Sequence, residues 1–346
     1  MADWREKKYL EPELRHLFLE LTLRCNEHCL HCGSRCGENE ILDEVSLETY
    51  KQLLDEVGEN FDKKRVQLCI TGGEPLLRRD FFEILGYAHE KGFHWGMTSN
   101  GTLITEEVAA RLAEVGMGTI SVSLDGLRES HDAFRRSPGG YDRAMAGIHH
   151  LVDNGSFKHV QVTTVIHHQN IGELDRLFEE LDKIDIDSWR IINMEPMGRA
   201  LEHPELMLTE DDYRKLFAYI RRMRSLGYPV SYGCSHFLGL DLEREVRDWY
   251  YLCIAGIYTA SIMTNGDIGA CLDIERRPET IQGNIYRDRF TDVWKNRFEY
   301  FRRDGSALNE TCAACPDRRY CAGDSWHSWD FDNMRPRVCF KGILWD

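Results

Sequence analysis

Short apolar runs alternate with amphipathic stretches over the first two hundred residues of the chain. The runs are partly β-branched, which is typical of buried parallel strands, and they lie at 17–23, 66–70, 94–98, 119–124, 159–166 and 189–194. Between them, apolar positions recur at helical spacing at 47–58, 80–91, 106–115, 141–152 and 171–184. This alternation predicts a parallel α/β sheet with right-handed crossovers.

Six strands in a curved sheet of this kind predict a partial (β/α)6 barrel, with the chemistry at the carboxyl ends of the strands. One more helix is predicted at 209–226, where Gly227 supplies the stop signal. We expect a barrel domain at 15–230, a linker at 231–252 and a small cysteine-rich domain at 253–346. The helical pattern at 290–303 and a hairpin turn at 265–267 belong to that last domain.

Three cysteines, Cys25, Cys29 and Cys32, directly follow the first predicted strand. Thiolates are soft ligands, and four of them complete a four-iron cluster, so three leave one iron free for a small chelating molecule. A structural zinc site is the alternative. Zinc sites usually pair such cysteines with a second cysteine pair or with histidines, and the next thirty residues contain no second pair. The spacing therefore favours an iron–sulfur cluster.

Polar residues also follow other predicted strands. Gly72, Gly73 and Glu74 come after the second strand; the glycines permit close approach of the backbone to a ligand, and Glu74 can accept hydrogen bonds from an ammonium group. Ser123 and Asp125 end the fourth strand. Taken alone, each of these segments would be an ordinary turn with a solvated polar side chain.

The Cys-x3-Cys-x2-Cys motif, the Gly-Gly-Glu segment and the Ser-Leu-Asp-Gly strand end together resemble the signatures of radical S-adenosylmethionine (SAM) enzymes. The resemblance covers residues 15 to about 200. It implies that SAM chelates the open iron, and that one electron from the cluster cleaves SAM to methionine and a 5′-deoxyadenosyl radical. It also implies that the cofactor-binding residues are Gly72, Gly73, Glu74, Ser123, Asp125 and Asn170.

The cysteines of the last hundred residues resemble those of the SPASM domain, which holds auxiliary iron–sulfur clusters in the peptide- and protein-modifying, sulfatase-maturase-like radical SAM enzymes. The resemblance implies a complete four-thiolate site, a [4Fe-4S] cluster with no open iron, formed by Cys312, Cys315, Cys321 and Cys339. A structural zinc fits this spacing acceptably, and the preceding domain favours iron and sulfur.

A second auxiliary site departs from the family pattern, because Ser325 stands where that pattern has another cysteine. Only Cys253 and Cys271 remain of its motif. The cluster is absent, or uses a substitute ligand, or the two cysteines are reduced core thiols. The candidate substitutes are Asp324, His327 and Cys234. The intact spacing of the two cysteines favours a cluster with a non-standard ligand, so we expect one or two auxiliary [4Fe-4S] clusters.

The composition of the chain restricts the expected binding partners and the expected cellular compartment. The net charge of -15 and the lack of a basic block argue against nucleic acid or an anionic membrane as the main partner. The polar start is not a signal peptide, and no apolar run approaches the ~20 residues of a membrane span. Twelve cysteines without a secretion signal are typical of cluster ligands in a reducing compartment, so we expect a cytoplasmic protein.

The resemblance implies an enzyme that cross-links, epimerises or oxidises a peptide or protein side chain, with an auxiliary cluster taking up the remaining electron. A flavodoxin- or ferredoxin-type protein would supply the reducing electron. Only about 16 residues precede the first predicted strand, so we expect any leader peptide to be recognised by a separate protein or by the barrel mouth.

Two alternatives stay open: a radical SAM dehydrogenase or rearrangement enzyme acting on a small molecule, and a non-catalytic iron–sulfur or zinc protein. Cys234, as a hydrogen-atom donor, and Asp273, as a base, are the candidate catalytic residues. A buried inert thiol is the alternative interpretation of Cys234.

Overall fold

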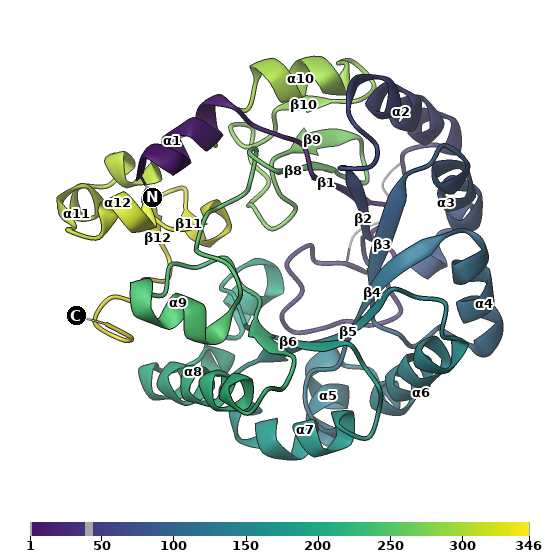
Figure 1. Cartoon of the computed structure of the whole chain (residues 1–346), viewed down its shortest axis with the longest axis horizontal. Helices are drawn as coiled ribbons and strands as arrows, with labels where there is room; N and C mark the ends of the chain where they lie inside the picture. The colour runs from purple at the N-terminus through teal and green to yellow at the C-terminus, as the bar shows by residue number, and fades with distance from the viewer. Residues whose placement is uncertain (1, 39–43, 346) are drawn as a thin grey trace.

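The computed structural model describes residues 2–38 and 44–345 and contains one curved sheet of ten strands in the order β10-β9-β8-β1-β2-β3-β4-β5-β6-β7 (Figure 1). The strands are β1 His16–Glu20, β2 Gln67–Thr71, β3 His94–Ser99, β4 Met117–Ser123, β5 His159–Ile166, β6 Ser188–Asn193, β7 Val230–Tyr232, β8 Thr259–Ile262, β9 Asp267–Gly269 and β10 Gly283–Asn284. Neighbouring strands from β8 through β1 to β7 pair in parallel, whereas β9 pairs antiparallel with both β8 and β10.

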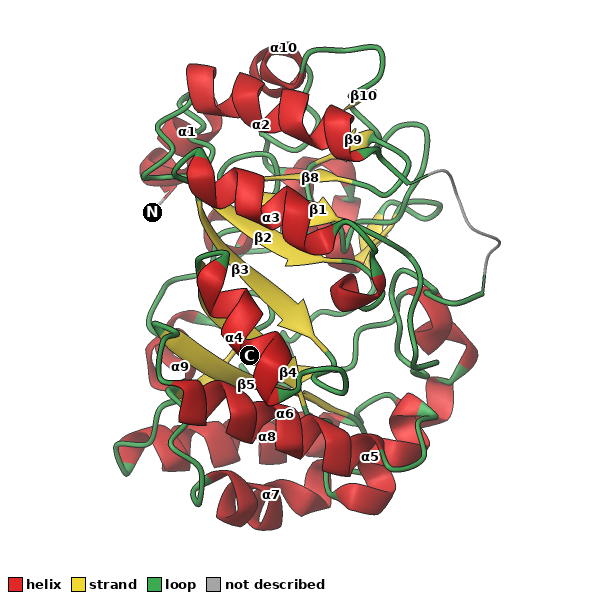
Figure 2. Cartoon of the chain, turned by 90° about the vertical axis from the view of Figure 1, so that its right-hand side faces the viewer, coloured by secondary structure: helices red, strands yellow, loops and turns green. Residues whose placement is uncertain are grey.

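Helices cover the outer face of this sheet, and Figure 2 shows several of them side by side over the strands. They are α1 Ala2–Leu10, α2 Leu47–Asn60, α3 Phe81–Glu90, α4 Glu106–Glu114, α5 Arg128–Arg135, α6 Gly140–Asn154, α7 Leu174–Leu181, α8 Glu210–Ser225, α9 Leu240–Val246, α10 Phe290–Asn296, α11 Glu310–Ala314 and α12 Arg318–Cys321. Their starts follow local chemistry: Ser46 and Thr105 accept hydrogen bonds at the starts of α2 and α4, and Thr209 and Asp212 form a capping box on α8.

The six strands and the partial parallel barrel predicted from the sequence are confirmed. The strands are buried as expected: in β1, Leu17 and Leu19 have no exposed surface. Because the strands are parallel, their carboxyl ends share one edge of the sheet, where the loop after β1 also lies. In Figure 1 this purple loop crosses the middle of the ring of strands.

The sheet extends further than the sequence predicted. Strand β8, from the cysteine-rich region, pairs in parallel with β1, with His16 opposite Thr259, and β7 pairs in parallel with β6. All four residues of β8 are buried, which accounts for its place inside the sheet rather than in a separate unit. The C-terminal region is therefore built directly onto the barrel.

Some helices differ from expectation. Helices α1 and α5 were not predicted, and α9 lies within the stretch at 231–252 that was predicted to be an irregular linker. The pattern at 290–303 forms a helix only as far as Asn296, after which Phe298 and Phe301 enter the core from turns. In the part of the chain that the structure describes, no helix is long and apolar enough to cross a membrane.

Candidate active site

The loop after β1 carries Cys25, Cys29 and Cys32, all half-buried free thiols. Its backbone is fixed at two places on the other side of the barrel. The amide of Leu30 donates a hydrogen bond of 2.9 Å to the carbonyl oxygen of Phe134, and the carbonyl oxygen of Cys32 accepts one of 3.1 Å from the amide of Arg199. The loop therefore spans the carboxyl end of the barrel and holds its three thiols there.

The two glycines after β2 let this loop pack against the next strand end. The amides of Gly73 and Glu74 donate hydrogen bonds of 2.7 and 2.9 Å to the carbonyl oxygens of Thr22 and Arg24. A Cβ atom on Gly72 would lie 2.4 Å from the Thr22 oxygen, and one on Gly73 would lie 2.1 Å from the Arg24 oxygen. The sequence predicted a close approach to a ligand, whereas the close approach that the structure shows is between two segments of backbone.

The chemistry of the three thiols fits a shared cluster. Burial raises the pKa of Cys25 to about 11 and raises that of Cys29 well above its usual range, and the charge on Cys32 adds to both shifts. Cys36 lowers the pKa of Cys32, because its thiol and its backbone amide donate hydrogen bonds to the Cys32 sulfur, with the amide nitrogen 3.3 Å from that sulfur. Thiolates crowded into one buried space need a positive partner, which iron supplies.

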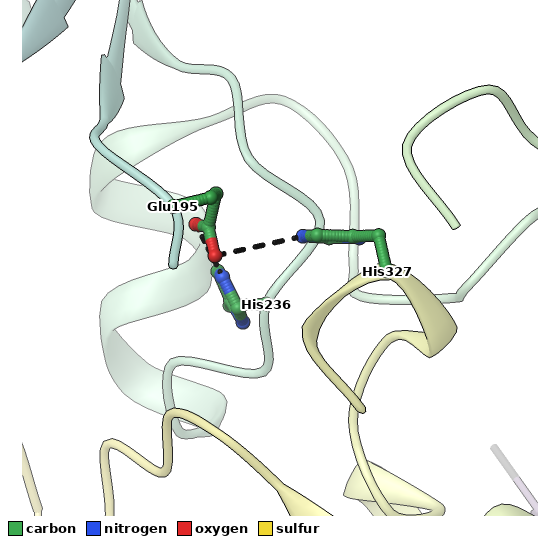
Figure 3. A group of neighbouring side chains, drawn as sticks. All are labelled: Glu195, His236 and His327. Carbon is green, nitrogen blue, oxygen red and sulfur yellow. Dashed lines mark hydrogen bonds and ion pairs between the residues drawn. The ribbon is translucent and has the colours of Figure 1, made fainter. Parts of the chain in front are cut away.

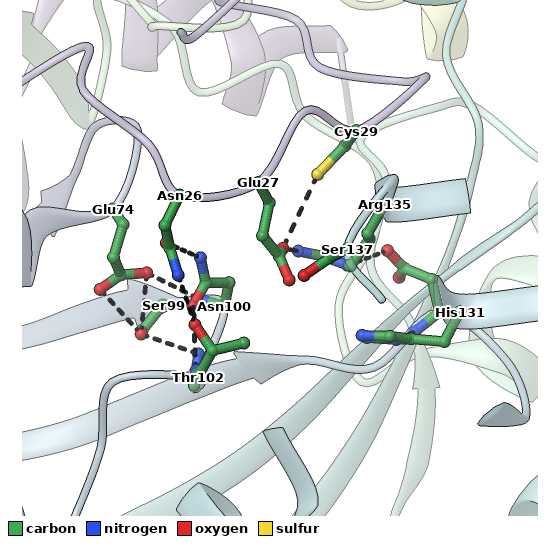
Figure 4. Close-up of polar contacts among 12 residues, drawn as sticks. Asn26, Glu27, Cys29, Glu74, Ser99, Asn100, Thr102, His131, Arg135 and Ser137 are labelled. Atoms are coloured by element: carbon green, nitrogen blue, oxygen red, sulfur yellow. Dashed lines mark hydrogen bonds and ion pairs between the residues drawn. The ribbon is translucent and has the colours of Figure 1, made fainter. Parts of the chain in front are cut away.

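Glu74 is completely buried and belongs to a polar network that reaches the cysteine loop (Figure 4). Its carboxylate accepts hydrogen bonds of 3.0 and 3.1 Å from the Ser99 hydroxyl and of 2.9 Å from the Asn100 amide. The Asn100 side chain donates to Asn26, and Asn26 donates to Thr102, each at 2.8 Å. Burial raises the pKa of Glu74 to about 7 despite these donors.

A buried ion-pair network lies further along the loop (Figure 4). Arg135, the last residue of α5, donates hydrogen bonds of 2.8 Å to Glu27 and 2.7 Å to Asp125. The second Asp125 oxygen accepts from the Val165 amide at 2.8 Å. Burial alone would raise the pKa of Asp125, but the guanidinium of Arg135 holds it below its usual value. This network ties the cysteine loop to the ends of β4 and β5.

The SAM-binding residues predicted for the later strands lie at or just after the ends of β4 and β5, as expected. The side chains of two of them already form hydrogen bonds within the protein. Both Asp125 oxygens accept protein hydrogen bonds, as described above. The Asn170 side chain accepts from the His167 amide at 2.7 Å and donates to the Val165 carbonyl at 2.9 Å. Ser123 is half-buried at the end of β4. Contacts of Gly72, Gly73, Glu74, Ser123, Asp125 and Asn170 with SAM stay predictions.

Sequence reasoning did not find several residues of this site. The His31 ring stacks on Phe134 with centroids 4.4 Å apart, and Phe134 stacks on His167 at 4.2 Å. Glu27 and Arg135 were also missed. Glu27 lies inside the cysteine motif, which is a signal that could have been used, but no local pattern identifies Arg135 as its partner.

Cys312, Cys315, Cys321 and Cys339 gather in the C-terminal region, on and around α11 and α12. Besides burial, the charges of Cys339 and Cys315 raise the pKa of Cys312, and that of Cys339 raises the pKa of Cys321. These contributions indicate that the thiols lie close enough to influence one another, which is compatible with four ligands of one cluster. Arg5 of α1 donates to the carbonyl oxygens of Arg319 and Tyr320 and so anchors α12.

Cys253 and Cys271 also lie near each other, and Ser325 lies beside them. Burial raises the pKa of both thiols; the charge of Cys253 contributes at Cys271, and a hydrogen bond with the Ser325 side chain partly offsets the shift at Cys253. Asp324, one candidate substitute ligand, instead accepts a 2.9 Å hydrogen bond from the Phe237 amide. Ser325 thus lies next to Cys253, and its hydroxyl group donates a hydrogen bond to the carbonyl oxygen of Ser235.

The two candidate catalytic residues lie in different surroundings. Cys234 is buried directly after β7, with its sulfur 4.0 Å from the Asn193 carbonyl oxygen, and burial raises its pKa well above the usual value. Asp273 is exposed, and its carboxylate lies 3.8 Å from the Cys271 sulfur. Asp273 thus borders the site of Cys253 and Cys271, and catalytic roles for both residues stay predictions.

Comparisons with known proteins agree with this geometry. The family model described as the radical SAM superfamily matches residues 19–181, and the SPASM iron–sulfur cluster-binding domain matches residues 253–316. Mycofactocin maturase MftC of Mycolicibacterium smegmatis is 31% identical over 313 residues, which cover 88% of this chain and 76% of that protein.

This chain belongs to the radical SAM superfamily. The radical SAM enzyme is also 28% identical over 322 residues to an AdoMet-dependent heme synthase of Methanosarcina barkeri, covering 88% of this chain and 89% of that protein. Its fold matches that of the solved structure of anSMEcpe with bound AdoMet, with a TM-score of 0.70 at 19% identity over 92% of this chain and 90% of that one.

The predicted family, SPASM subgroup and fold are confirmed. The cofactors of this radical SAM/SPASM enzyme are SAM, a [4Fe-4S] cluster and auxiliary iron–sulfur centres, as the sequence predicted. The interpretation as a non-catalytic iron–sulfur or zinc protein is wrong, because the superfamily to which the chain belongs consists of enzymes.

Proposed function

We propose that this radical SAM/SPASM enzyme oxidatively modifies a side chain of a peptide or protein. The observation that carries the proposal is the 31% identity to a maturase, MftC, along 88% of this chain. The four thiols around α11 and α12 support it, because a closed auxiliary cluster can take up an electron from the substrate. A flavodoxin- or ferredoxin-type reductant and a separate leader-binding protein are the partners that we expect.

The residues of the barrel have defined tasks in this reaction. Cys25, Cys29 and Cys32 would hold the cluster, which with SAM supplies a 5′-deoxyadenosyl radical for abstracting a substrate hydrogen atom. Glu74 would accept hydrogen bonds from the methionyl amino group. Arg135 holds the cysteine loop in place further along its length.

The rings of His31, Phe134 and His167 form a stack beside the loop, where the Leu30 amide bonds to the Phe134 carbonyl oxygen, and they restrict the access of water there. His31 is half-buried, and this burial lowers its pKa to about 4, so its ring is neutral at physiological pH. A neutral, apolar wall next to the reacting centre is suited to hydrogen-atom transfer rather than to proton transfer.

A second candidate function is the modification of a small molecule of the iron-porphyrin class. The alignment with the heme synthase of Methanosarcina barkeri favours it, because that relative and this chain match along nearly their whole lengths. This candidate requires a planar macrocycle, rather than an extended peptide, to enter the carboxyl end of the barrel.

One assay separates the two candidates. The anaerobically reconstituted enzyme is reduced with dithionite, given SAM, and offered either a peptide encoded next to its gene or iron coproporphyrin. Peptide modification predicts a mass change in the peptide and faster formation of 5′-deoxyadenosine than without it. The same two signals with the porphyrin alone would overturn the peptide proposal, and Cys29→Ala should abolish both signals in either case.

A further inference from the structure

Two histidines and a glutamate come together where the barrel meets the C-terminal region. Glu195 follows β6, His236 follows β7, and His327 lies in a short 3-10 helix, Trp326–Ser328. One potential ligand atom from each residue lies within 4.8 Å of the other two. Figure 3 shows both imidazole rings directed toward the Glu195 carboxylate. The carboxyl ends of two parallel strands and a segment almost a hundred residues later thus contribute to one cluster.

The cluster is tightly built and shielded from solvent. The Nε2 atom of His236 lies 2.8 Å from Oε1 of Glu195, and the Nε2 atom of His327 lies 4.0 Å from Oε2. The three side chains are only 11%, 0% and 13% exposed for Glu195, His236 and His327. Among the described residues, Oε2 of Glu195 is buried and has no hydrogen-bond partner. A buried carboxylate oxygen without a donor is costly, and a cation would satisfy it.

Outer contacts orient these side chains as they do around protein-bound metals. The other ring nitrogen of His236, Nδ1, lies 2.6 Å from Oδ2 of Asp324. Asp324 is itself held by the Phe237 amide at 2.9 Å, and the Asn193 side chain donates a 2.6 Å hydrogen bond to Oε1 of Glu195. A carboxylate on the far nitrogen of a histidine fixes the ring tautomer with the proton on that nitrogen, so that the near nitrogen, here the Nε2 atom facing Glu195, is the one that would bind a metal.

Ligand type and charge identify the class of ion. Two imidazoles and one carboxylate with open positions are typical of iron(II) and of catalytic zinc sites. Glu195 and Asp324 bring two negative charges into a buried space, so a divalent cation bound to two neutral imidazoles would neutralise the group. The ligand set contains no sulfur, which distinguishes it from the cysteine sites.

We propose that Glu195, His236 and His327 bind one divalent transition-metal ion, zinc or iron(II), at a site separate from every iron–sulfur centre of the chain. The ion ties the ends of β6 and β7 to the segment that carries Ser325, and its remaining coordination positions accept oxygen donors. The alternative occupant of this space is a proton on His236, which would make the group a buried ion pair. The proposal does not depend on whether the substrate is a peptide or a porphyrin.

Zinc provides the probe, because iron at the clusters does not interfere with its signal. The cluster-loaded protein is incubated with zinc, passed through a desalting column and assayed for zinc and iron. The wild-type protein should retain about one zinc ion per chain, as a three-ligand site predicts. X-ray absorption at the zinc edge should show only nitrogen and oxygen neighbours at about 2.0–2.1 Å, without sulfur at about 2.3 Å.

Two substitutions test the ligands separately. Glu195→Gln keeps the shape of the side chain and His327→Gln removes one imidazole; each should lower retained zinc at least tenfold while the iron content stays unchanged. His203→Gln is the matched control, because His203 also lies beside a carboxylate, that of Glu205 at 3.2 Å, but outside the cluster. The proposal would be overturned in favour of the buried ion pair if the wild-type protein retained no more zinc than the two variants, or if the zinc edge showed sulfur ligands.

Discussion

The guanidinium of Arg135 donates a 2.8 Å hydrogen bond to the carboxylate of Glu27, which lies between the first two cysteines of the cluster motif. The same guanidinium contacts Asp125 at 2.7 Å, and all three side chains are almost fully buried. One arginine thus bridges two carboxylates and fixes the cysteine loop against the end of β4. The position of the loop depends on charge pairing as well as on iron ligation.

Removing this arginine should destabilise the protein strongly. Arg135→Leu leaves two buried carboxylates without their cationic partner, so we expect a loss of about 3–5 kcal/mol in the free energy of unfolding. Anaerobic urea unfolding of the cluster-loaded protein measures the loss, and iron analysis should show less iron. Arg128→Leu is the control: its exposed ion pair with Asp142 should contribute at most about 1 kcal/mol. Equal losses in the two variants would contradict the assigned role of Arg135.

A methyl group on Gly73 should prevent the cysteine loop from packing. Its Cβ atom would lie 2.1 Å from the Arg24 carbonyl oxygen and 3.1 Å from the Cβ atom of Cys25. We therefore expect Gly73→Ala to lose the iron of the SAM-binding cluster, and with it 5′-deoxyadenosine formation, while the auxiliary iron remains. Gly172→Ala serves as the control, since no atom lies within 4 Å of a Cβ there. Full iron content in Gly73→Ala would show that the loop can shift without cost.

Restoring the missing cysteine should allow a second auxiliary cluster to form on three thiolates. Ser325 already lies beside Cys253, and Asp324 and His327 are directed at other partners, so we expect about eight iron atoms per wild-type chain and about twelve in Ser325→Cys. Iron and sulfide analysis, together with electron paramagnetic resonance of the reduced protein, gives the count.

Ser328→Cys is the control for that experiment, because this buried serine lies three residues further on and donates to the Ser325 carbonyl oxygen. It should leave the iron content unchanged. A wild-type count near twelve would mean that Cys253 and Cys271 already hold a cluster with a non-standard ligand.

The affinity for SAM should depend on pH through Glu74. Burial raises the pKa of this carboxyl group to about 7, so it is ionised above that pH and neutral below it. An ionised carboxylate is the stronger hydrogen-bond acceptor, so SAM should bind about tenfold more weakly near pH 6 than near pH 8. Equilibrium binding to the oxidised, cluster-loaded enzyme measures the change.

Glu74→Gln separates this effect from titration of SAM itself. The variant should bind SAM more weakly near pH 8, and the difference from the wild type should disappear toward pH 6. A pH dependence that is the same in both proteins would assign it to SAM or to another group.

The local sequence was enough to predict the parts of this enzyme that arise from periodicity and spacing. Six strands and the main helices follow from the alternation of apolar and amphipathic segments, and Cys25, Cys29 and Cys32 are placed together by a single short loop. The two glycines after β2 were recognised, although what they approach is the loop backbone. These features depend on residues that are neighbours in the chain, so a local pattern in the sequence is enough to predict them.

Other features depend on which distant segments meet, and only the tertiary structure decided them. Arg135 pairs with Glu27 across 108 residues, and β8 joins the barrel sheet beside β1 although the two strands are encoded at opposite ends of the chain. The cluster of Glu195, His236 and His327 draws one residue from each of three separate segments. No local periodicity specifies such contacts, because they form only when sheet and helices pack and bring buried charges within hydrogen-bonding distance of one another.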